Sequence, residues 1–295
     1  MRHKSVTYTA FNVTLHPHSP QKYIDLFDAC FDLRRSINLR GDSYGLMTSL
    51  NPIDRDDEAK GLIGEIGRYT RIHSERWLNT LTLKPAEKNE RKSIHIPEEL
   101  KPNYLSYGFV FYPMGHKLIV ECKDSHGAIS PKTLYRYFRS LFDTPDINDR
   151  FGRIELTAIP DADQLDKIFK IERLRILTLT INRPNPDDFD DLEEDVLERL
   201  NNQNVREQII TFKAQQGATI VPDAFTKGMS KVAEHNGKVE GEGSDREGKK
   251  VSLSTDSHPL QVTGTFPANT ITQMDFLVSM AQKIRSKLRS AKANV

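Results

Sequence analysis

The sequence predicts an α+β fold, in which helices pack on a mixed, largely antiparallel sheet and the chain ends in a basic helix. Two observations support this class. Residues 173–200 have the pattern of a strand, a proline-containing turn and a helix, and similar units precede the helices expected at Pro20 and Pro131. Residues 106–112 and 116–120 form a clear hairpin pattern around a Pro-Met-Gly turn. This hairpin, together with the other antiparallel pairs expected below, argues against a doubly wound parallel sheet.

The segment Arg173–Leu200 is the best defined part of the chain. Ile176–Ile181 is apolar and β-branched, which predicts an internal strand. Asn185 is expected to cap the following helix and Pro186 to occupy its first position. The aspartates that follow are expected to stabilise the positive end of the helix dipole. One apolar stripe at helical spacing should be buried: Phe189, Leu192, Val196 and Leu200.

Further strands are expected in the first half of the chain. Tyr44–Leu50, Leu62–Ile72 and Trp77–Leu83 are interpreted as an antiparallel meander, with Trp77 in the core. The helix after Pro131 should direct Leu134, Phe138, Leu141 and Phe142 inward.

The second half is expected to be more helical. Val205–Gln216 is interpreted as a helix, Asp223 as the cap of a helix over Ala224–Asn236, and Lys238–Ser254 as a hairpin. A last helix should begin near Ile271. We therefore predict an α+β core over residues 1–204 and a helical and hairpin region over 205–295 that ends in the basic helix.

Composition narrows the class of protein. The chain has 295 residues, 37% hydrophobic and 28% charged, with a mean hydropathy of −0.56, and it contains neither a long apolar run nor a signal-peptide pattern. We expect no membrane span and a cytoplasmic location. Cys30 and Cys122 are too few for a disulfide framework and should be reduced.

One motif indicates an enzyme. Leu118–Lys123, LIVECK, is an apolar strand that ends in Glu-x-Lys, and it resembles the core of restriction-endonuclease-like nucleases. There the glutamate helps to hold a divalent metal and the lysine helps to activate water, roles that would fall to Glu121 and Lys123. The preceding strand lacks the aspartate of that motif, so an ordinary cross-strand pair is the alternative, and whether the chain is an enzyme stays open. His16 and His18 have no visible third metal ligand and are interpreted as loop histidines.

Two basic helices indicate a nucleic-acid ligand. On the helix after Pro131 and on the last helix, cations recur at helical spacing: Lys132, Arg136, Arg139, Lys283, Arg285, Lys287, Arg289 and Lys292. In the last helix they flank a narrow stripe of Leu277, Ala281, Ile284 and Leu288, which suits packing against a symmetry mate. A terminal helix packed on its own domain is the alternative.

Several unusual phrases, including LHPHSP, LRRSINLRGDSYG, FGRIELTAIPD and RPNPDD, resemble an uncharacterised bacterial family associated with phage-related and mobile-element loci. The resemblance implies a role in phage defence or exclusion and assigns no active site. Our leading hypothesis is a non-catalytic homodimer that binds DNA or RNA with low sequence specificity and needs no cofactor. The alternatives are a nuclease with a divalent metal at Glu121 and Lys123, and a component that binds a partner protein from the same locus.

Overall fold

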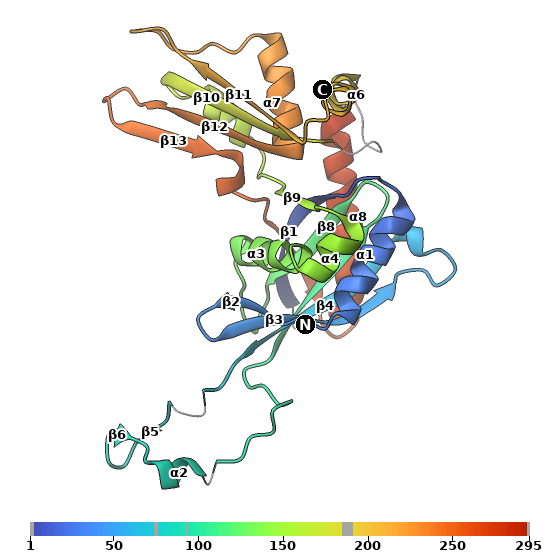
Figure 1. Cartoon of the computed structure of the whole chain (residues 1–295), viewed down its shortest axis with the longest axis vertical. Helices are drawn as coiled ribbons and strands as arrows, with labels where there is room; N and C mark the ends of the chain where they lie inside the picture. Colours follow the sequence, from blue (N-terminus) through green and yellow to red (C-terminus); the bar gives the residue numbers. More distant parts are fainter. Residues whose placement is uncertain (1–2, 74–75, 93, 185–190, 294–295) are drawn as a thin grey trace.

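The computed structural model describes residues 3–73, 76–92, 94–184 and 191–293. It confirms the α+β class, since all strand pairs of its named sheets are antiparallel and helices cover those sheets. Figure 1 shows two packed units and, at the far end of the molecule, a long excursion of the chain between residues 70 and 105.

The first unit is built on a large curled sheet. Within the described ranges, eight strands form it in the order β14-β1-β8-β7-β4-β3-β2, and β9 also pairs with β1. These strands are β1 (His3–Thr14), β2 (Ile37–Arg40), β3 (Ser43–Pro52), β4 (Leu62–Thr70), β7 (Leu105–Tyr112), β8 (Lys117–Lys123), β9 (Glu155–Ala158) and β14 (Val262–Pro267). The short helix η1 (Glu58–Lys60) joins β3 to β4.

Helices bury both faces of this sheet. On one face lie α1 (Pro20–Asp32), α3 (Pro131–Phe142) and α4 (Pro145–Phe151), whose aromatic side chains form the larger core with Phe109 and Phe111. Ser19 and Ser130 cap α1 and α3 as the sequence indicates. On the other face α8 (Gln273–Ala293) packs against β7, β8 and β14.

The second unit is inserted between β9 and β14. Its sheet has the order β11-β10-β12-β13, from β10 (Arg173–Asn182), β11 (Glu207–Lys213), β12 (Gly237–Ser244) and β13 (Lys250–Ser254). It packs on α5 (Gln164–Phe169), α6 (Asp191–Asn202) and α7 (Ala224–Asn236), and η3 (Thr255–Ser257) follows β13. The chain enters and leaves through a paired neck, where Asp161 N donates to His258 O at 2.8 Å and Leu260 N to Ile159 O at 2.8 Å.

The predicted division at residue 204 runs through this second sheet. Strand β10, on the N-terminal side of that boundary, pairs with β11 and β12 on its C-terminal side. Strand β10 is internal, as predicted, with Leu177, Leu179 and Ile181 fully buried. The predicted cap at Asn185 and Pro186 lies outside the described residues.

Two expected elements are wrong. The centre of Val205–Gln216 forms the edge strand β11 in place of a helix, because pairing with β10 half-buries Ile210 and Phe212 while Ile209 is 60% exposed. Trp77–Leu83 does not extend the meander. It contains only β5 (Leu78–Asn79), which pairs with β6 (Lys84–Pro85) ahead of α2 (Lys88–Lys92) in the excursion, and Trp77 is only half-buried.

The expectation that the stripe of α8 packs on a symmetry mate is also wrong. Leu277, Ala281 and Ile284 are buried against the chain's own sheet, beside Val110 and Ile119. Met280 and Phe276 widen the apolar face beyond the stripe that the sequence pattern indicates. In the part of the chain that the structure describes, no helix is both long and apolar enough to cross a membrane.

We predict that Leu179→Asp destabilises the protein by about 3 to 5 kcal/mol, because the carboxylate would be buried between Ile210 and Val239 without a partner. The matched control is Thr178→Asp on the opposite, half-exposed side of the same strand, which should cost far less. Urea denaturation of both variants measures the difference, and equal losses would contradict the burial of β10.

We predict that truncation after Asn269 abolishes cooperative unfolding of the first unit. Each large apolar side chain of α8 contributes about 1.5 to 3 kcal/mol by burial, and their sum approaches the whole stability of a domain. Differential scanning calorimetry tests this. A truncated protein that keeps the thermal transition of the full chain would show that α8 is dispensable.

Candidate functional site

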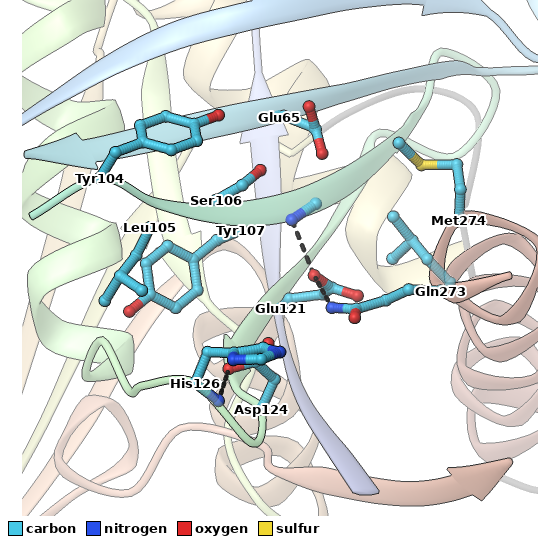
Figure 2. A pocket seen from close by; sticks show the side chains of 12 residues that line it. Glu65, Tyr104, Leu105, Ser106, Tyr107, Glu121, Asp124, His126, Gln273 and Met274 are labelled. Carbon is cyan, nitrogen blue, oxygen red and sulfur yellow. Dashed lines mark hydrogen bonds between the residues drawn. The ribbon is translucent and has the colours of Figure 1, made fainter. Parts of the chain in front are cut away.

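The residue that the structure singles out is Glu121 of β8. It is 3% exposed and lies on the face of the sheet that α8 covers. Gly108 N donates to its Oε2 at 2.9 Å and Gln273 Nε2 donates to the same oxygen at 3.2 Å (Figure 2). Among the described residues, no hydrogen-bond partner lies within reach of Oε1. This buried oxygen is therefore left for a proton or a ligand.

Glu121 lies in a pocket of about 500 Å³ between the sheet and the start of α8. We call it the Glu121 pocket, and its lining is Glu65, Tyr104, Leu105, Ser106, Tyr107, Gly108, Glu121, Asp124, His126, Gln273, Met274 and Leu277. Asp124 is held in place because its Oδ1 accepts from His126 N at 2.8 Å and Gly127 N at 2.9 Å.

Burial changes the acidity of Glu121. Desolvation raises its pKa from 4.5 to about 7, against the two hydrogen bonds to Oε2, and the carboxylates of Asp124 and Glu65 raise it slightly further. A glutamate with this pKa exchanges its proton near neutral pH, as binding and acid–base groups in active sites do.

The structure separates the two residues of the Glu-x-Lys motif. Glu121 is inside the pocket, whereas Lys123 is exposed and is not among the described side chains that line it. Across the described ranges, no three His, Cys, Asp or Glu side chains are placed to hold a metal ion together. His18 therefore belongs to no such group. Its ring packs edge-on against that of His116, with the ring centroids 4.5 Å apart.

The cations of the two basic helices lie on opposite faces of the first sheet, because α3 packs on one face and α8 on the other. Arg139 pairs with Asp143 at 2.8 Å and with Glu155 at 3.3 Å, and Arg136 donates to the carbonyl of Leu39. Lys132 is exposed. Two of the three cations of α3 are therefore engaged within the chain.

The cations of α8 differ among themselves. Arg285 stacks over Tyr112 at 4.4 Å and donates to Met114 O at 2.7 Å, so it fixes the helix to the β7–β8 turn. Lys283, Lys287 and Arg289 are exposed, and within the described residues none of them makes an ion pair or a hydrogen bond. We call these three residues the α8 cationic edge. Lys292 lies beyond the side chains that the structure describes.

The α8 cationic edge borders a cleft of about 650 Å³ between the two units. Further cations of this cleft are Arg285, Lys117 and Lys231, and its acids are Asp161, Asp163, Asp166 and Glu234. The acids come from the neck, α5 and α7, so the cleft is of mixed charge and its cations are concentrated along α8.

Sequence reasoning identified Glu121 but missed the residues around it. Glu65 on β4 and Gln273 at the start of α8 lie far from Glu121 in sequence, and only the sheet and the packing of α8 bring them together. Gly108 on β7 pairs with Glu65 on β4. On the other side of β7, Phe109 pairs with Val120 of β8, and the same register places Gly108 opposite Glu121. No pattern in the sequence indicates that Glu65, Gly108 and Glu121 lie side by side on neighbouring strands.

A sequence profile of the domain of unknown function DUF4747 matches residues 4–282. The chain belongs to this family. The matched range contains the sheet of the first unit, the inserted unit, the Glu121 pocket and the first half of α8, and it ends just before Lys283. A comparison with curated proteins found no significant match. The prediction of an uncharacterised family is confirmed.

We predict that Glu121→Gln increases stability at neutral and alkaline pH. The folded chain holds one proton more than the unfolded chain between about pH 4.5 and 7, so the contribution of this proton to stability is complete below pH 4.5 and is lost as the pH rises through 7. The Glu121→Gln variant has no proton to lose at this position, so its stability does not fall in this way. Its free energy of unfolding, relative to the wild type, should rise by about 3 kcal/mol between about pH 4 and pH 8.

Urea denaturation of the two proteins at both pH values measures this difference. A difference that does not change with pH would mean that Glu121 titrates at its ordinary value in the folded chain.

Proposed function

We propose that this DUF4747 protein binds nucleic acid with low sequence specificity along the α8 cationic edge. The observation that supports this proposal is that Lys283, Lys287 and Arg289 are exposed and unpaired within the described residues, although acids line the same cleft. Unpaired surface cations contact phosphates at little desolvation cost, and the release of counterions from the polyanion favours binding.

The geometry of α8 is consistent with a backbone contact. Lys283 and Lys287 are one helical turn apart on a helix that its apolar face fixes to the sheet. A rigid helix loses little conformational entropy when its side chains contact phosphates. Contacts of this kind position a nucleic acid and do not read its sequence, which is why we propose low specificity.

The test is a charge reversal at Lys283, Lys287 and Arg289 to Glu, with binding of duplex DNA, single-stranded DNA and RNA followed by fluorescence anisotropy. Loss of three phosphate contacts should reduce the salt slope on duplex DNA by about 3 and weaken binding strongly at low salt. Circular dichroism should be unchanged, because all three side chains are exposed.

The matched control reverses three exposed cations elsewhere, Lys213, Lys227 and Lys249 to Glu, which changes the net charge equally. It should retain most of the binding. If both triple variants lose affinity alike, net charge and not the α8 cationic edge determines binding. If the wild-type protein binds none of the three nucleic acids, the proposal fails.

A role in phage defence or phage exclusion, in a bacterial cytoplasm and as a homodimer, comes from the sequence resemblance and pattern alone. It stays a prediction. Counts of plaques on cells that express the wild-type chain or the α8 triple variant would test the role. Sedimentation analysis would test the dimer.

The nuclease alternative has one observation in its favour, the buried Glu121 in a pocket. It also needs Lys123, which lies outside the described lining, so the reaction would need another group to position water. Cleavage assays with Mg²⁺ or Mn²⁺ on wild type and Glu121→Gln test this alternative.

The protein-interaction alternative is supported by the excursion between β4 and β7. Several of its apolar side chains are exposed, among them Leu78, Leu81 (93%), Leu83 and Leu100. Exposed apolar groups of this kind occur at contact sites between proteins.

A further inference from the structure

The Glu121 pocket exists because a glycine lies between two glutamates. In one row across the sheet, Glu65 on β4 pairs with Gly108 on β7, and Glu121 on β8 lies on the other side of Gly108. A Cβ at position 108 would come within 2.7 Å of Leu277 Cδ2 and 3.3 Å of Glu121 Oε2. The absent side chain leaves a space that both glutamates line together with the start of α8 (Figure 2).

The lining has the chemistry of a site for an organic cation. Its charged groups among the described residues are the carboxylates of Glu65, Glu121 and Asp124, and it includes no lysine or arginine. Its lining includes the apolar and aromatic residues Tyr104, Met274 and Leu277, and also Leu105 and Tyr107, whose side chains pack in the larger core. Acidic groups within an apolar wall favour a ligand that has a positive charge on an apolar or aromatic body.

Two further observations point to a ligand. Oε1 of Glu121 and Oγ of Ser106 are both buried without a hydrogen-bond partner among the described residues. A buried acceptor without a donor costs free energy, so a ligand with N–H groups would satisfy it. A metal ion is a poorer fit, because no three His, Cys, Asp or Glu side chains among the described residues are grouped to hold one.

We propose that the Glu121 pocket binds a small organic cation, a protonated amine or amidine on an apolar body, and that Oε1 of Glu121 accepts its N–H groups. This inference is independent of nucleic-acid binding by the α8 cationic edge. The pocket is at the N-terminal end of α8, whereas the cationic edge begins at the middle of the helix and continues into its second half.

Binding should depend on pH. A bound cation stabilises the ionised form of Glu121, whose pKa is about 7 in the free protein, so binding must displace a proton at lower pH. The affinity should fall by about tenfold per pH unit below 7, toward the pKa of the complex, and level off above 7. The titratable groups around Glu121 are Tyr8 on β1, Glu65 on β4, Tyr107 on β7, and Asp124 and His126 after β8, while α8 contributes the neutral Gln273.

The test compares benzamidine, an amidinium on an aromatic ring, with benzamide, its neutral analogue of the same shape. Isothermal titration calorimetry on the full chain at about pH 8 should detect saturable binding of benzamidine, at concentrations up to about 10 mM, and much weaker binding of benzamide. Glu121→Gln should weaken benzamidine binding by about 10- to 100-fold and remove its pH dependence between pH 6 and 8.

The matched control is Glu193→Gln, since Glu193 is also 3% exposed but belongs to the second unit and hydrogen-bonds Asn236. It should leave benzamidine binding unchanged, and so should the α8 triple variant. Circular dichroism checks that each variant is folded.

Three outcomes would overturn the proposal: no saturable binding of benzamidine, equal binding of benzamide, or an equal loss in the Glu121 and Glu193 variants. None of them bears on the anisotropy result with nucleic acids, so the two proposals fail separately.

Discussion

The pairing of β1 with β14 is the interaction on which the rest of the structure depends. Strand β1 lies inside the first sheet, with Val6 and Tyr8 buried under α8 and Phe11 and Val13 buried under the helices of the opposite face. Its partner β14 reaches it only after the chain has completed the inserted unit and returned through the paired neck. The two ends of the chain therefore complete one core, and neither half of the sequence contains a finished first unit.

The Glu121 pocket is a consequence of the same closure. Helix α8 is the next element after β14, and its first two turns place Gln273 beside Glu121 and Leu277 over Gly108. Two hydrogen bonds to Oε2 favour the ionised carboxylate, but desolvation is the larger effect and raises the pKa. Burial under α8 therefore gives this glutamate a pKa of about 7, and groups with such shifted pKa values are frequent at functional sites.

Helix α8 combines two surfaces with different energetics. Its inner face is apolar and buried and stabilises the fold by hydrophobic burial. Its outer cations contribute little to stability, because exposed charges in water interact weakly with the rest of the protein. Arg285 helps to hold the helix on the sheet, as the buried apolar side chains do, since its guanidinium stacks on Tyr112. Charge alone does not distinguish the cations that hold the helix from those that are free to meet a ligand.

The sequence by itself determined the local elements: the capped helices α1, α3 and α7, the β7–β8 hairpin and the apolar strand β10 all follow from periodicity, caps and turn residues. It also indicated Glu121 through its place at the end of an apolar strand. The tertiary structure alone decided that the centre of Val205–Gln216 pairs as the edge strand β11, that α8 covers its own sheet, and that Glu65, Gly108 and Gln273 surround Glu121. The physical reason is that caps and periodicity act over a few residues, whereas strand pairing and desolvation depend on groups more than a hundred positions apart, as Glu121 and Gln273 are.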